Sequence, residues 1–112
     1  DKEKFSTTLQ NLKSSKKVVD FYVKENLYKN TNFDYKKNRL ILNNDFFYQP
    51  YEIVFRGLSD TLKQISGKYY AVRGKKIDNL INKLNNNRLF RVTLGGCIIE
   101  KVNQSVIISK EY

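Results

Sequence analysis

The chain has 112 residues, a formal net charge of +10 and 40% apolar residues. This length fits one domain with a core of its own, and five glycines with a single proline argue against disorder. There is no histidine, which excludes a Ser-His or Cys-His nucleophile and any metal site with a histidine ligand.

Further features restrict the setting in which the protein acts. One cysteine cannot form an internal disulfide, which favours a reducing cytoplasm. No apolar run approaches the roughly 20 residues that cross a bilayer, so no membrane partner is expected. The chain begins Asp1-Lys2-Glu3 and contains no methionine, so we expect a fragment of a longer protein or a processed chain.

Three segments have the apolar spacing of a helix, at residues 4–27, 50–66 and 76–85. In the first, one stripe is formed by Phe5, Leu9, Leu12, Val19, Tyr22, Val23 and Leu27. In the second, Glu52 and Arg56 are spaced for a helical ion pair, and Gly67 provides a C-terminal stop. Asn85-Asn86-Asn87 ends the third, since asparagine is a common left-handed cap.

Two segments alternate like strands. Residues 33–42 predict a β-hairpin whose turn contains Lys36-Lys37-Asn38, and residues 97–109 predict a second with its turn at Asn103-Gln104. Between the last helix and this hairpin, Gly95-Gly96 favours a bulge or tight turn. The predicted fold is a single α+β domain over residues 1–112, with about three helices packed against two antiparallel β-hairpins.

Positive charge is concentrated between residues 63 and 91. This stretch holds eight basic residues and one acid, Asp78, which accounts for +7 of the net charge. The eight are Lys63, Lys68, Arg73, Lys75, Lys76, Lys83, Arg88 and Arg91. Such clustering favours a polyanion partner, although a lysine-rich solvated surface remains the alternative explanation.

Arg73-Gly74-Lys75-Lys76 opens the third helix, where free backbone N–H groups and the helix dipole already favour anions. The residues that we expect to contact RNA are Lys68, Tyr70, Arg73, Lys75, Lys76, Arg88 and Arg91. Tyr70 would contact a sugar or base, and the arginines and lysines would contact phosphates.

No catalytic or metal-binding residue is predicted. Gly95-Gly96 lacks the spacing of a phosphate-binding loop, Cys97 has the character of a small buried apolar residue, and the acids are scattered.

The second half of the chain contains an ordered set of residues: Arg56-Gly57-Leu58, Leu62, Gly67, Tyr70, Arg73, Leu80, Thr93-Leu94-Gly95-Gly96-Cys97-Ile98-Ile99 and Ser109-Lys110-Glu111. This set resembles the region after the catalytic domain in tRNA(Ile)-lysidine synthetases, especially alphaproteobacterial ones. The resemblance covers residues 50–112 well and 1–49 only loosely. Ala71-Val72 replaces the prolines that often precede the arginine, and Lys110-Glu111 replaces an Arg-Glu pair.

The resemblance implies a bacterial tRNA-processing enzyme of the cytoplasm. The family joins lysine to a cytidine of the tRNA(Ile) anticodon through an adenylated intermediate made with ATP. Its ATP chemistry depends on a Ser-Gly-Gly-x-Asp-Ser loop in an N-terminal domain, which Ser66-Gly67-Lys68 does not match. These residues would therefore be the non-catalytic, cofactor-free tRNA-binding part. The partners would be tRNA and the catalytic N-terminal domain of the same chain, which uses ATP and lysine.

Two alternatives remain from the sequence. A winged-helix DNA-binding domain has helices and a hairpin in this order, but about eight residues separate the helices where a helix-turn-helix has three or four. A secreted or surface protein-interaction module would account for the absent start methionine.

Overall fold

The computed structural model describes residues 12–68 and 71–111, and only the backbone of residues 12–15. It has the predicted α+β class. In chain order its elements are α2 (Leu12–Asn30), β1 (Thr31–Asp34), β2 (Arg39–Leu42), the 3-10 helix η1 (Asn44–Tyr48), α3 (Tyr51–Ser66), α4 (Gly74–Asn86), β3 (Leu89–Leu94), β4 (Cys97–Val102) and β5 (Ser105–Lys110).

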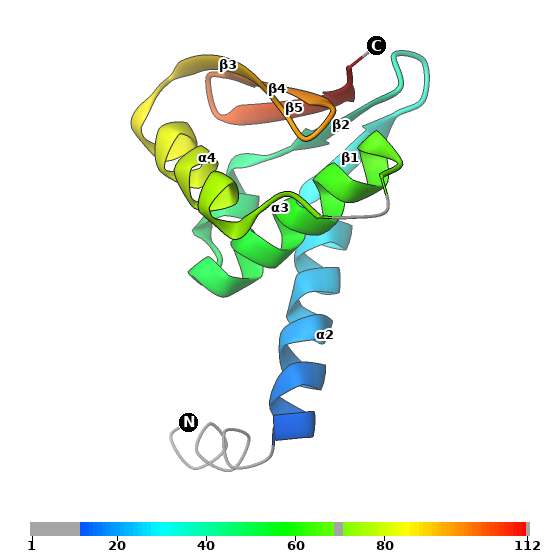
Figure 1. The fold of residues 1–112 in the computed structure, drawn as a ribbon, viewed down its shortest axis with the longest axis vertical. Coiled ribbons are helices and arrows are strands. Elements are labelled where there is room, and N and C mark those ends of the chain that lie inside the picture. Colours follow the sequence, from blue (N-terminus) through cyan, green and yellow to red (C-terminus); the bar gives the residue numbers. More distant parts are fainter. Residues whose placement is uncertain (1–11, 69–70, 112) are drawn as a thin grey trace.

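The strands form one antiparallel sheet in the order β1-β2-β5-β4-β3 (Figure 1). Both predicted hairpins are present, and β2 joins them by pairing with β5, so that Leu42 lies opposite Val106. The sequence did not predict that residues 89–94 form a fifth strand, which pairs with β4 at the sheet edge.

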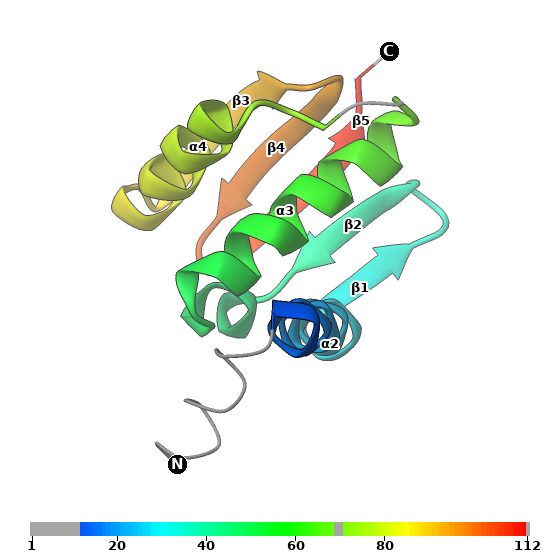
Figure 2. The same ribbon diagram turned by 60° about the horizontal axis from the view of Figure 1, so that its bottom comes forward.

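Helices α3 and α4 lie side by side on one face of the sheet (Figure 2). Each presents its apolar stripe to the strands, as the 3.6-residue spacing predicts. The buried core on this face comprises Leu42, Phe46, Val54, Leu58, Leu62, Ile77, Leu80, Ile81, Leu84, Cys97, Ile99, Val106 and Ile108.

No described element covers the other face of the sheet, which we call the open face (Figure 1). Side chains alternate between the two faces along each strand. Since Leu40 and Ile108 pack with the core, Arg39 and Ser109 belong to the open face, where the register places them opposite each other. On the same face, Ile98 of β4 lies opposite Ser109 of β5.

Helix α2 leans against the β1 side of the body and extends beyond it (Figure 1). Its attachment is near its C-terminal end, where Val23 and Asn26 are buried and Asn26 Nδ2 donates to the Phe46 carbonyl oxygen at 3.2 Å. Tyr22, predicted to lie on the apolar stripe, is 54% exposed, because the side of the helix that meets the body carries Asp20, Val23 and Leu27. The helix ends at Asn30, later than predicted, and the predicted residues 4–11 lie outside the described part.

At Gly67 and at Gly95-Gly96 the chain ends a helix or turns where the sequence predicts. Gly67 ends α3 in the left-handed conformation, with its N–H donating to the Lys63 carbonyl oxygen at 3.1 Å. Gly95 and Gly96, at φ values of 62° and 83°, form the predicted tight turn between β3 and β4. The predicted left-handed asparagine cap of α4 is wrong, because Asn87 is extended and its Nδ2 donates to the Lys83 carbonyl oxygen at 2.7 Å.

Candidate nucleic-acid interface

Helix α4 separates apolar from charged residues more sharply than its neighbours. Its inward face buries Ile77, Leu80, Ile81 and Leu84. Its outward face exposes Lys75, Lys76, Asp78, Asn79, Asn82 and Lys83. We call this outward face, together with Arg73 and Arg88 at its two ends, the α4 surface. Cations and amides on it offer hydrogen-bond donors to phosphate and sugar oxygens.

The beginning of α4 carries three exposed cations, Arg73, Lys75 and Lys76. Arg73 is the N-cap, and no side-chain hydrogen bond caps the helix there. The first N–H groups of a helix have no intrahelical acceptor, and the helix dipole adds partial positive charge. Side-chain charge and backbone therefore favour an anion at the same place.

Two carbonyl groups at the end of α4 accept hydrogen bonds from side chains of the fold. Lys101 Nζ, from the facing strand β4, donates to the Leu84 carbonyl oxygen, and Asn87 bonds the Lys83 carbonyl oxygen. Lys101 is thus engaged in the fold, whereas Arg88 immediately beyond the helix is exposed.

The cations of the α4 surface have no carboxylate partner in the described part of the chain. The ion pairs found there are Lys29–Glu25, Arg39–Asp34 and Arg56–Asp20. The predicted Glu52–Arg56 pair is wrong, because Arg56 reaches across to Asp20 instead. The positive charge of α4 is therefore not neutralised by the folded chain around it.

The structure does not bring all the predicted RNA-binding residues to one surface. Arg91 lies on the open face, since its neighbours Phe90 and Val92 pack against the core on the helix side. Lys68 lies beside the Gly95–Gly96 turn, where its Cε would be 3.1 Å from a Cβ added at Gly96. Tyr70 lies outside the described residues.

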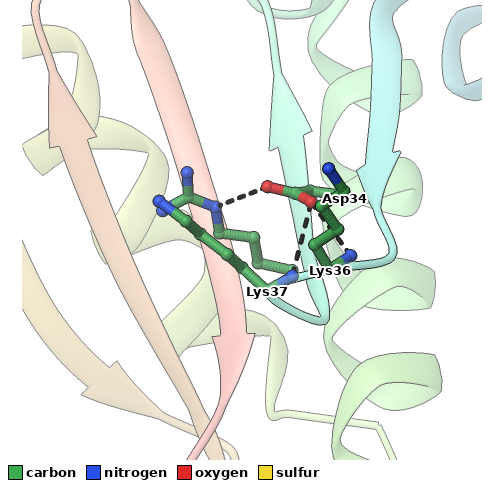
Figure 3. Close-up of polar contacts among 4 residues, drawn as sticks. Asp34, Lys36 and Lys37 are labelled. Carbon is green, nitrogen blue, oxygen red and sulfur yellow. Dashed lines mark hydrogen bonds and ion pairs between the residues drawn. The ribbon is translucent and has the colours of Figure 1, made fainter.

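A second group of cations, which sequence reasoning did not single out, lies at the β1–β2 turn (Figure 3). These cations are Lys36, Lys37 and Arg39. The backbone N–H groups of the two lysines and the guanidinium of Arg39 contact Asp34 there. Lys110, at the end of β5, lines the same depressions as Asn38. The Lys36–Arg39 run was visible in the sequence, but only the pairing of β2 with β5 brings Lys110 beside it.

The other features considered in the described residues are the Cys97 thiol, metal-ligating side chains and membrane-spanning helices. Cys97 is buried, its Sγ donates to the Leu62 carbonyl oxygen at 3.4 Å, and burial raises the pKa of its thiol above the ordinary 9.0. Residues 12–68 and 71–111 contain no cluster of three metal-ligating side chains. The helices described here are too short or too polar to cross a bilayer.

Comparison with protein-family models, with curated proteins and with solved structures found no match.

Proposed function

We propose that the chain is the tRNA-binding part of a tRNA(Ile)-lysidine synthetase, working in the cytoplasm beside a catalytic N-terminal domain that uses ATP and lysine. The observation that carries the proposal is the α4 surface, where five exposed cations (Arg73, Lys75, Lys76, Lys83 and Arg88) lack a carboxylate partner among the described residues.

Charge of this kind suits a nucleic-acid backbone. Each phosphate that a protein neutralises releases condensed counterions, which gives affinity without base recognition. Asn79 and Asn82, exposed among the lysines, add neutral donors and acceptors suited to 2′-hydroxyl groups. An RNA recognised by shape and backbone fits this surface.

Part of the resemblance to the ligase family lies in residues that build the fold. Leu58, Leu62, Leu80 and Cys97 belong to the buried core. The Gly95-Gly96 element forms a turn with positive φ values. The ordered set thus contains residues that specify this fold, and the α4 surface supplies the contact with RNA.

A mobility-shift titration with a tRNA(Ile) transcript tests the proposal. The variant R73Q/K75Q/K76Q removes three cations from the start of α4. The matched control K16Q/K17Q/K24Q removes three exposed cations from α2, which lies toward the opposite edge of the sheet. The α4 variant should bind at least about tenfold more weakly, and its slope of log affinity against log salt should fall by about two to three.

If the two variants lose the same amount of tRNA affinity, the α4 surface is not the binding site. Absence of salt-sensitive tRNA binding by the unmodified chain would contradict the proposal itself and favour the interaction-module alternative.

The winged-helix alternative has less support. α3 ends at Ser66 and α4 begins only at Gly74, and both helices lie along one face of the five-stranded sheet. A helix-turn-helix has a turn of three or four residues. Tighter binding to duplex DNA than to tRNA of equal length would reverse this ranking.

A further inference from the structure

The β1–β2 turn is held in one shape by a single carboxylate (Figure 3). Asp34 Oδ1 accepts hydrogen bonds from the backbone N–H groups of Lys36, at 3.1 Å, and Lys37, at 3.3 Å. Asn38 completes the turn in the left-handed conformation, at a φ of 53°. The two lysine side chains therefore project from a preorganised backbone and are both exposed.

Arg39 follows the turn and is anchored by the same carboxylate. Its Nε lies 3.5 Å from Asp34 Oδ2, an ion-pair distance without hydrogen-bond geometry. Nε is buried and has no hydrogen-bond acceptor in the described part of the chain. The guanidinium is thus held beside Asp34, while its Nε has no hydrogen-bond acceptor among the described residues.

Beside Arg39 lies a depression of about 280 Å³ at the end of the open face. It is lined by Lys37, Asn38, Arg39, Ile98, Ser109 and Lys110. The β2–β5 register places Ser109 directly opposite Arg39, which brings a hydroxyl next to the guanidinium. No carboxylate lines this depression, and Asp34, the acid beside Arg39, is engaged with the turn.

We propose that this depression is a phosphate-binding site, formed by Lys37, Arg39 and Lys110 with the Ser109 hydroxyl. Three cations and a hydroxyl around a hollow match the charge and the several acceptor oxygens of a phosphate group. Ile98 contributes an apolar side chain to the lining. Arg39 supplies the geometrically fixed donor, and the two lysines act as mobile point charges.

An RNA backbone is the source of phosphate that we expect, and this part of the inference rests on the proposed function. The site would be a contact separate from the α4 surface, because α4 lies above the β3 side of the sheet whereas the β1–β2 turn is at the other side (Figure 2). An RNA that touches both would span the sheet.

The test compares two charge-matched variants of the full chain. K37Q/K110Q removes two cations of the depression, and K16Q/K24Q removes two exposed cations from α2. Asp34 and Arg39 stay unchanged, so the turn is preserved, and equal thermal unfolding of the two variants checks this. K37Q/K110Q should bind the tRNA(Ile) transcript about fivefold more weakly than K16Q/K24Q, with a salt slope lower by about one.

A second readout does not depend on RNA. In backbone amide spectra, titration with inorganic phosphate should shift the signals of Lys37, Asn38, Ser109 and Lys110 in the unmodified chain and not in K37Q/K110Q. These shifts together with an RNA affinity equal to that of the control would support the site and identify a small phosphorylated molecule as its ligand.

Absence of the shifts combined with equal RNA binding by the two variants would overturn the site. If the unmodified chain binds no tRNA at all, the proposed function fails, and the phosphate titration alone decides for or against the site.

Discussion

The guanidinium of Arg56 on α3 donates to the carboxylate of Asp20 on α2, with Nη2 and Oδ1 2.5 Å apart. This pair and the Asn26–Phe46 hydrogen bond are side-chain contacts between α2 and the body. Val23 and Asn26 are the buried residues of α2 in the described part of the chain, so the Arg56–Asp20 pair helps to fix the angle at which the helix leaves the body.

Asp20→Asn should lower the free energy of unfolding by about 1 kcal/mol, the upper end for a partly exposed ion pair. Glu25→Gln, which breaks the exposed Lys29–Glu25 pair on the same helix, is the control and should cost less than about 0.5 kcal/mol. Urea unfolding measures both. A double-mutant cycle that combines Asp20→Asn with Arg56→Gln should give a favourable coupling energy between the two residues. A coupling energy near zero would show that their contact does not stabilise the fold.

Gly95→Ala should destabilise the fold by about 1–3 kcal/mol. The residue has a φ of 62°, and an added Cβ would lie 2.4 Å from Val72 Cγ2. Gly67→Ala is the control, because Gly67 has a similar φ of 73° but open space around it, and should cost about 1 kcal/mol. Thermal unfolding measures the difference, and equal costs would mean that the Val72 contact relaxes freely.

Lys101→Met should lower the free energy of unfolding by about 1–2 kcal/mol, because the Leu84 carbonyl oxygen at the end of α4 loses a charged donor. Lys83→Met is the matched control, since Lys83 is exposed on α4 and its side chain has no hydrogen bond or ion pair among the described residues. Urea unfolding of the two variants should separate them by at least about 1 kcal/mol. If the two variants unfold with equal free energies, water replaces Lys101 as the donor to the Leu84 carbonyl oxygen without loss of stability.

The Cys97 thiol should make stability depend on pH in the alkaline range. Burial raises its pKa in the fold above 9.0, so above that pH the unfolded chain ionises first and the free energy of unfolding falls. Below pH 9.0 both states keep the proton and the contribution is constant. The stability difference between the unmodified chain and Cys97→Ala should therefore shrink between pH 8 and pH 10, and a difference independent of pH would contradict the buried thiol.

The elements with clean apolar spacing could be predicted from the sequence, and those set by long-range contacts could not. The core stripes of α3 and α4 follow from local periodicity, which places their ends within two residues of those predicted. The partner of Arg56 could not be predicted, because Glu52 is its sequence neighbour and Asp20 becomes its neighbour only when α2 docks.

The same distinction applies to the candidate sites. The cations around the start of α4 lie within four residues of one another, so the sequence alone was enough to locate them. Arg91 is only a few residues from α4, but strand alternation turns it to the open face. Lys37 and Lys110 come together only through the β2–β5 register, which a single sequence does not specify.

The strand order has a consequence for how the protein is made. β5, the last strand in the chain, lies at the centre of the sheet, between β2 and β4. On the ribosome, the early hairpin and the β3–β4 pair cannot unite until residues 105–110 have left the exit tunnel. Until then β2 exposes a free edge, a state open to proteases and to mispairing with other chains.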